Sequence, residues 1–143
     1  ARLVHRLDRD TSGLILLARD AETHRRLSAA FAERRIRKTY LAMVEGSPGD
    51  RCGVIDLPLA RVATRPPRYG VVPLAGGGKP SLTRWRLLRS GPRASLLLLQ
   101  PRTGRSHQLR VHLAALGHPV LGDPLYGDPA AASLRARAPP ARG

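Results

Sequence analysis

Three polar clusters in this chain hold the residue types that can do chemistry. The first covers residues 5–13, His-Arg-Leu-Asp-Arg-Asp-Thr-Ser-Gly, and places Asp8 between Arg6 and Arg9. A carboxylate beside a guanidinium stays ionised and oriented, which suits a nucleophile or a general base. The plainer interpretation is a loop aspartate in turn hydrogen bonds. The local pattern alone favours that interpretation, because structural ion pairs also perturb pKa values.

The second and third clusters add an aromatic ring and more cations. In Lys-Thr-Tyr at residues 38–40, Tyr40 could stack on a nucleobase and use its hydroxyl as an acid or base. Residues 103–110 are Thr-Gly-Arg-Ser-His-Gln-Leu-Arg. Because His107 and Arg110 are three residues apart in a predicted helix, they share a face, and Arg110 could pair with a carboxylate or grip a phosphate. Taken singly, a half-buried strand tyrosine and an exposed helix arginine are the simpler interpretations.

Other reactive arrangements have weaker support. His107, His112 and His118 lack the spacing that places two imidazoles on one helical face, and no cysteine pair assists them, so no metal site is predicted. Residues 104–108 resemble the G-x-S-x-G turn of serine hydrolases only superficially, because the last glycine is replaced by glutamine. A hydrolase that uses Ser106 and His107 is therefore the weakest alternative.

Two helices are expected to carry parts of these clusters. Asp20 is a suitable N-cap for a helix over residues 21–34. Ser106 is the expected N-cap of a second helix over residues 107–116, and Gly117 is its expected stop.

The strands follow from apolar runs between turn residues. The run at residues 14–18 predicts a buried strand, whereas residues 61–80 are basic, rich in Pro and Gly, and predicted to be mostly loop. Further strands are expected at residues 38–45, 53–59, 81–89 and 94–100, the last two as a hairpin. This succession favours an α+β fold with a largely antiparallel sheet.

Length and charge set the broad class of protein. The 143 residues fit one domain, and 25 Lys and Arg against 10 Asp and Glu give a formal net charge of +15. Such a chain attracts polyanions, nucleic acid first. An aromatic fraction of 3% argues against a broad stacking platform for single strands. With one cysteine, no apolar run of about 20 residues and no signal-peptide segment, we expect a cytoplasmic protein without disulfides or membrane association.

Taken together, the three clusters resemble the motifs of the RluA-type RNA pseudouridine synthases. The third is extended by Gly-His-Pro-Val-Leu-Gly-Asp and then Tyr-Gly. The matching segments are residues 5–14, 38–46, 103–112 and 117–127. A chance match of three long motifs in the same order as in the family is very improbable. The resemblance is closest to the RluA subgroup itself, which modifies large-subunit rRNA and tRNA.

The resemblance implies catalytic roles for three residues. Asp8 aligns with the family's catalytic aspartate, Tyr40 with the tyrosine that packs on the target uracil, and Arg110 with the basic residue that ion-pairs with the aspartate. The implied reaction isomerises uridine to pseudouridine within RNA. Asp8 would act at the sugar, either attacking C1′ or removing a ribose proton, and no metal or organic cofactor is implied.

The resemblance also implies an RNA partner. Arg6 aligns with an arginine that helps fill the stack vacated by the flipped base, and RNA contacts are expected from Arg105 and His107 as well. Extruding a stacked uridine costs a few kcal/mol, which an inserted Arg6 would partly offset. The expected partner is a structured rRNA or tRNA stem-loop, and the expected protein is a monomer.

The implied fold is the α+β pseudouridine synthase catalytic fold, a bent and mostly antiparallel sheet with flanking helices. Family members carry sequence before the first motif and after the last that this chain lacks. We therefore expect a partial catalytic domain over residues 1–127, truncated at both ends, and a weakly ordered tail over residues 128–143. The alternative function is a catalytically inactive RNA-binding fragment, with salt-sensitive RNA affinity but no turnover.

Overall fold

A computed structural model describes residues 1–127, and the predicted tail at residues 128–143 lies outside them. Contacts divide the chain into two compact units, the first formed by Ala1–Arg37 and the second beginning at Lys38. The partial catalytic domain over residues 1–127 stays a prediction. Within the described residues, no helix is both long and apolar enough to cross a bilayer.

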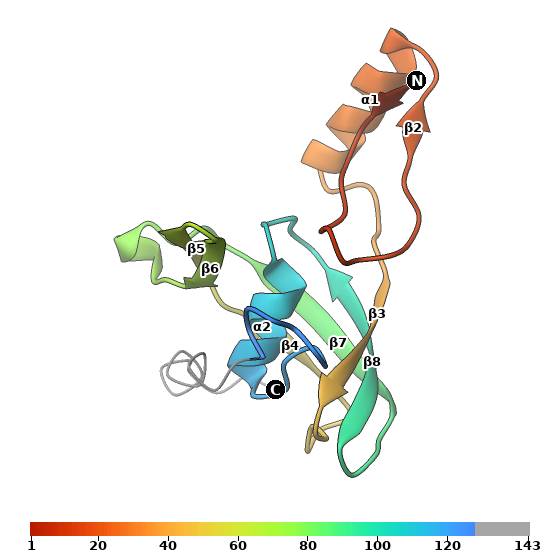
Figure 1. The fold of residues 1–143 in the computed structure, drawn as a ribbon. Coiled ribbons are helices and arrows are strands. Elements are labelled where there is room, and N and C mark those ends of the chain that lie inside the picture. The colour runs from red at the N-terminus through yellow and green to blue at the C-terminus, as the bar shows by residue number, and fades with distance from the viewer. Residues whose placement is uncertain (128–143) are drawn as a thin grey trace. The chain divides into compact units, whose positions relative to one another are not determined.

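The first unit contains a short two-stranded ribbon (Figure 1). β1 (Arg2–Leu3) pairs antiparallel with β2 (Leu17–Ala18). The predicted buried strand at residues 14–18 is therefore wrong over most of its length, and the Leu14 side chain is 93% exposed. Within residues 1–37, β1 is the only ladder partner, and its two residues are too few to bury the apolar run.

A single helix, α1 (Ala21–Ala32), completes the first unit. The Asp20 side chain accepts a hydrogen bond of 2.7 Å from the Thr23 N–H, which confirms the predicted N-cap. The helix ends before the predicted residue 34, because Arg34 takes a left-handed backbone conformation with φ 57°.

The second unit is built on a four-stranded antiparallel sheet in the order β3-β8-β7-β4 (Figure 1). Its strands are β3 (Tyr40–Glu45), β4 (Cys52–Asp56), β7 (Leu82–Arg89) and β8 (Ala94–Pro101). β7 and β8 form the predicted hairpin, and β3 pairs with the other side of β8. Helices combined with antiparallel sheets confirm the predicted α+β class.

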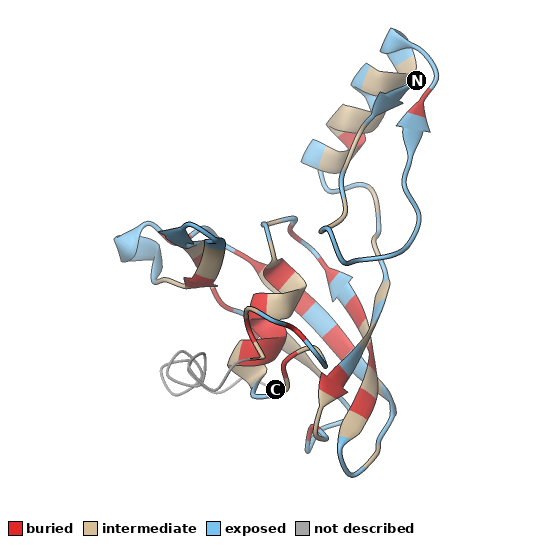
Figure 2. Ribbon diagram, in the orientation of Figure 1, coloured by how far each residue is buried: buried red, intermediate tan, exposed pale blue. Residues whose placement is uncertain are grey.

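The core of the second unit lies between this sheet and α2 (Gln108–Leu116). Buried side chains alternate along β8 with side chains that are half-buried or exposed (Figure 2). Leu97 and Leu99 of this strand are 0% exposed. Each such leucine contributes about 1.5–3 kcal/mol by burial. The buried cluster consists of Val44, Ile55, Leu57, Trp85, Leu97, Leu99 and Leu113. This cluster packs α2 against the sheet, because Leu113 of the helix belongs to it.

A second hairpin occupies part of the segment that the sequence predicted as loop. β5 (Leu59–Thr64) pairs antiparallel with β6 (Pro67–Val71), and a short 3-10 turn, η1 (Leu74–Gly76), follows. The prediction that residues 61–80 are mostly loop is wrong for residues 61–64 and 67–71, where Pro67 opens β6 at a position where a strand tolerates proline. The high content of Pro and Gly therefore led to a loop prediction where the chain forms a hairpin.

The segment after α2 returns along the outer edge of β3, and we call residues 118–122 the edge segment. The Glu45 N–H donates to the Pro119 carbonyl at 2.9 Å, and the Leu121 N–H donates to the Met43 carbonyl at 2.9 Å. These bonds cover the C-terminal half of β3, which is an edge strand of the sheet. They also fix where the chain continues toward residue 123.

Candidate functional site

Asp8 lies half-buried in the loop that joins β1 to β2. His5 closes this loop, because its Nε2 accepts a hydrogen bond of 2.9 Å from the Leu16 N–H and its ring stacks on Phe31 of α1 with centroids 4.9 Å apart. The Asp8 carbonyl accepts a hydrogen bond of 3.0 Å from the Thr11 N–H, which makes a turn. The loop is thus pinned at its base and turned just after the aspartate.

The other residues predicted to meet the substrate differ in their surroundings. Tyr40 is the first residue of β3 and packs half-buried against the core of the second unit. Arg6 is exposed in the loop that carries Asp8. Arg105 is half-buried, and its Nε and Nη2 both donate to the Pro80 carbonyl at 3.3 Å. Arg105 therefore has a role in holding its own loop.

Gln108 anchors the third motif to the sheet. Its side-chain oxygen accepts hydrogen bonds from the Thr103 hydroxyl at 2.6 Å and the Arg105 N–H at 3.1 Å. Its amide nitrogen donates to the Leu82 carbonyl at 3.1 Å and the Thr83 hydroxyl at 3.0 Å. All the usual bonds of the amide are made in a residue that is 4% exposed. The loop before α2 is thereby fixed against β7.

His112 continues this network into the core. Its Nε2 lies 2.9 Å from the Leu57 carbonyl and its Nδ1 lies 2.8 Å from the Thr83 hydroxyl. Since a carbonyl only accepts, Nε2 carries the proton and Nδ1 accepts from the hydroxyl. Burial lowers the pKa of His112, although the Leu57 carbonyl and the Asp56 carboxylate act in the opposite direction. Among the described residues, no group of three His, Cys, Asp or Glu could hold a metal ion.

The N-cap of α2 is His107, whereas the sequence predicted Ser106. His107 has φ 55° and ψ 18°, in the left-handed region, and its side chain makes no capping hydrogen bond. Such a conformation in a non-glycine residue costs about 1–3 kcal/mol and is common at functional sites. The Ser106 prediction is wrong because the Gln108 side chain holds the turn instead. At the other end of the helix, Gly117 with φ 94° confirms the predicted stop.

Arg110 of α2 forms a buried ion pair with Asp123. The Arg110 Nε lies 2.7 Å from Oδ2 and its Nη2 lies 2.9 Å from Oδ1, with side chains 21% and 2% exposed. Oδ1 also accepts the N–H groups of Leu125 at 2.9 Å and Tyr126 at 3.2 Å. Burial, the largest influence, would raise the pKa of Asp123, but these hydrogen bonds, led by that from Arg110, outweigh it and lower the pKa. The pair uses one edge of a guanidinium that has five N–H donors.

Tyr126 lies at the centre of this arrangement and is 1% exposed. The Arg110 guanidinium carbon lies 4.9 Å from the centroid of its ring. Its hydroxyl lies 2.7 Å from Nδ1 of His107 and accepts the N–H of Tyr69 at 3.0 Å. Burial raises the pKa of Tyr126, with smaller opposing effects of the Tyr69 N–H and Arg110. The four residues His107, Arg110, Asp123 and Tyr126 are called the tyrosine array below.

The predicted site residues are thus brought together only in part. His107, the N-cap of α2, and Arg110 both contact Tyr126, whereas Asp8 belongs to the first unit and its pairing with Arg110 stays a prediction. Asp123 and Tyr126 were missed as site residues. Their signal was Gly-Asp-x-x-Tyr-Gly at residues 122–127, which had been noted only as part of the resemblance.

A comparison with protein-family profiles decides the family. The profile described as RNA pseudouridylate synthase matches residues 1–115, a stretch that contains Asp8, Tyr40 and Arg110. The chain belongs to the RNA pseudouridylate synthase family. This confirms the resemblance that the three motifs predicted.

Relatives within the pseudouridylate synthase family are similar along most of this chain. An uncharacterized RNA pseudouridine synthase of Zymomonas mobilis subsp. mobilis is 48% identical over 82% of this chain and 54% of its own length. Ribosomal large subunit pseudouridine synthase C of Vibrio vulnificus is 41% identical over 82% of this chain and 36% of its own. The solved structure of human RNA Pseudouridylate Synthase Domain Containing 1 has a TM-score of 0.82 at 38% identity, over 90% of this chain and 56% of that one.

These values confirm the pseudouridine synthase fold and show that this chain covers only part of the matched proteins. The chain spans about half of the Zymomonas relative and of the human structure, and about a third of the Vibrio relative.

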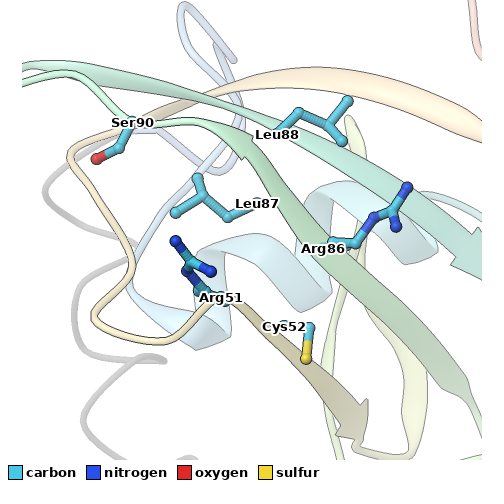
Figure 3. A pocket seen from close by; sticks show the side chains of 6 residues that line it. All are labelled: Arg51, Cys52, Arg86, Leu87, Leu88 and Ser90. Carbon is cyan, nitrogen blue, oxygen red and sulfur yellow. The ribbon is translucent and has the colours of Figure 1, made fainter.

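A surface pocket of this pseudouridylate synthase chain is lined by none of the residues of the tyrosine array. Figure 3 shows its lining, which comes from the start of β4, the end of β7 and the residues that flank these strands. The lining residues are Arg51, Cys52, Arg86, Leu87, Leu88 and Ser90. The pocket contains no carboxylate and none of the predicted site residues, so it offers no place for the expected chemistry.

Proposed function

We propose that this protein is an RNA pseudouridine synthase that isomerises uridine in structured RNA and uses Asp8 as its catalytic carboxylate. The observation that carries the proposal is the family match over residues 1–115, which includes each predicted catalytic residue: Asp8, Tyr40 and Arg110. The pinned loop around Asp8 supports it, because a catalytic group needs a fixed position.

The proposed reaction keeps every atom of the nucleotide except one exchanged proton. Asp8 acts at the ribose, by attack on C1′ or by removal of a ribose proton, and the bond between C1′ and N1 breaks. The detached uracil turns and C5 bonds to C1′, while Asp8 either leaves C1′ or returns the ribose proton that it removed. The proton then leaves C5, and N1 takes one up. Tyr40 is proposed to pack on the uracil and hold it during this turn.

Arg110 is proposed to keep Asp8 ionised. Its side-on pair with Asp123 engages Nε and Nη2, and the fork geometry of guanidinium gives it donors for a second carboxylate. The Asp123 pair therefore orients Arg110 and does not compete with the proposed role.

RNA affinity is proposed to come from the positive charge of the chain. A net charge of +15 attracts the phosphate backbone, and each phosphate contact releases counterions, so that affinity falls steeply with salt. The exposed Arg6 is proposed to fill the stack that the flipped uridine leaves. Because the Vibrio relative is named as a ribosomal large subunit synthase, we propose rRNA as the first substrate to test, with tRNA second.

The test is tritium release from RNA that carries uridine labelled at C5. We expect release by the wild-type protein and its loss in Asp8→Asn, with RNA affinity within about twofold of wild type because arginine contacts to the phosphates are proposed to supply that affinity. Asp10→Asn is the matched control, since it neutralises an exposed carboxylate in the same loop. Wild-type turnover by Asp8→Asn would refute the role of Asp8.

The second candidate is an RNA-binding fragment without turnover. It is favoured by one observation, that the chain spans only about half of the Zymomonas relative. RNA affinity that falls steeply with salt, combined with no tritium release by the wild-type protein, would establish this candidate in place of the enzyme.

A further inference from the structure

Two arginines of β7 lie on the face of the sheet that is turned away from α2. Along this strand exposed side chains alternate with buried ones, so that Arg84 and Arg86 are exposed on either side of the buried Trp85 (Figure 2). Trp85 belongs to the same buried cluster as Leu113 of α2. Because successive side chains of a strand point to opposite faces, the two arginines lie on the face that α2 does not cover.

A bulge in β7 brings a third arginine onto this open face. The pairing register with β8 shifts just before Arg89, and Leu88 is the extra residue. Arg86 is therefore opposite Leu98 and Arg89 is opposite Leu96. Side chains two residues apart on β8 share a face, so Arg89 follows Arg86 on the open face at about 7 Å along the strand. Regular alternation without the bulge would direct Arg89 toward the core.

The three residues Arg84, Arg86 and Arg89, called the arginine stripe below, are all exposed and lack a carboxylate partner. Within residues 1–127, none of them forms an ion pair. Their cross-strand neighbours include no acidic residue: Gln100, Leu98 and Leu96 on β8, and Val54 and Cys52 on β4. Like charges in a row repel one another, so a bound polyanion would relieve this repulsion.

We propose that the arginine stripe binds the phosphate backbone of the RNA substrate, separately from the residues that hold the reacting uridine. The inference rests on the proposed function, because the ligand is the RNA of that reaction. Guanidinium donors match phosphate oxygens, and a regular row of three can contact several phosphates of one strand. Since none of the cross-strand neighbours is aromatic, the stripe contacts the backbone and does not read the bases.

The experiment measures how RNA affinity depends on salt. The Kd for a fluorescent RNA stem-loop is determined between about 50 and 200 mM KCl, and each phosphate contact contributes about 0.7–0.9 to the slope of log Kd against log salt. Glutamine replaces all three arginines in the variant Arg84→Gln, Arg86→Gln, Arg89→Gln. We expect this variant to lower the slope by about 2–3 and the affinity about tenfold or more, equally for two stem-loops of different sequence.

A matched control removes the same formal charge from the first unit. Its substitutions are Arg25→Gln, Arg26→Gln and Arg35→Gln, all at exposed positions. Arg25 and Arg35 already form ion pairs with Glu22 and Glu33, so we expect the slope to stay within about 1 of wild type. An unchanged slope in the stripe variant, or an equal fall in both variants, would overturn the inference.

Two further sets of variants separate charge from folding. Lysine at the three stripe positions keeps the charge and is expected to preserve most of the wild-type slope. A slope as low as that of the glutamine variant would overturn the inference. The three single glutamine variants keep the test available should the combined variant not fold, and each is expected to lower the slope by about 0.7–0.9.

These readouts separate the inference from the proposed function. If the wild-type protein binds RNA but releases no tritium, the enzymatic proposal fails, while the slopes still decide the role of the stripe. Wild-type tritium release together with an unchanged slope in the stripe variant would remove the stripe from RNA binding and leave the proposed function intact. An unchanged RNA slope with lost binding to phosphatidylserine vesicles would assign the stripe to an anionic membrane and overturn the inference.

Discussion

Replacing Asp123 by asparagine tests whether a buried ion pair holds the tyrosine array. The substitution keeps the size of the side chain and one of its oxygens. That oxygen can still accept the N–H groups of Leu125 and Tyr126. The new amide nitrogen, however, faces the Nε of Arg110 across a distance that is 2.7 Å in the wild-type protein. A donor then meets a donor, and the positive charge of Arg110 loses its partner.

The expected loss follows from the burial of the pair. Removing one member of a buried ion pair costs about 3–5 kcal/mol, and a single charge-assisted hydrogen bond accounts for about 1.5–3 kcal/mol of such losses. The Asp123 side chain is 2% exposed and that of Arg110 is 21% exposed, so Arg110 recovers some hydration. We therefore expect the lower end, a loss of about 3 kcal/mol in the free energy of unfolding.

The assay is urea unfolding followed by the fluorescence of Trp85, the only tryptophan of the chain, which is 5% exposed in the core of the second unit. Asp50→Asn is the control, because it makes the same change in charge at an exposed position of the same unit. We expect the control to lie within about 0.5 kcal/mol of wild type. An equal effect of the two substitutions would refute the argument that Asp123 holds Arg110.

Two further predictions concern pH and packing. Stability is expected to fall as the pH drops below 6.5, the ordinary pKa of histidine, because the unfolded chain then protonates His112 while the buried ring, whose pKa is lowered, stays neutral. This contribution is at most about 1.4 kcal/mol per pH unit. It should vanish in His112→Gln when urea midpoints are compared across pH, and an unchanged slope would contradict it. Gly78→Ala is expected to cost more than about 2 kcal/mol, because a Cβ there would lie 1.8 Å from the Val72 carbonyl oxygen. Gly49→Ala, with no atom within 4 Å of a new Cβ, should leave the melting temperature unchanged, and similar melting temperatures for the two variants would contradict the packing argument.

The sequence predicted those elements whose signals are local. Asp20 caps α1 through a bond to the Thr23 N–H three residues away. The β7–β8 hairpin is marked by polar turn residues between two apolar runs. Gly117 ends α2 because its left-handed backbone is accessible to glycine without strain. In each case the residues that determine the structure are neighbours in the chain.

The failures concern contacts between residues that are distant in sequence. The apolar run at residues 14–18 predicted a buried strand, yet burial requires a sheet that the first unit does not provide. The hairpin of β5 and β6 was predicted as loop, and with it the Tyr69 N–H that binds the Tyr126 hydroxyl went unnoticed. The Asp123 partner of Arg110 was missed because the chain must first turn back along β3.

The edge segment joins two properties that are usually separate. Its bonds to Met43 and Glu45 shield a strand edge from intermolecular pairing, and the same segment leads directly into Asp123. A change that loosened residues 118–122 would release the anchor of Arg110 and also uncover backbone groups that recruit strands from other molecules. In this chain, residues 118–122 therefore both protect a sheet edge from aggregation and hold the partner of Arg110 in place.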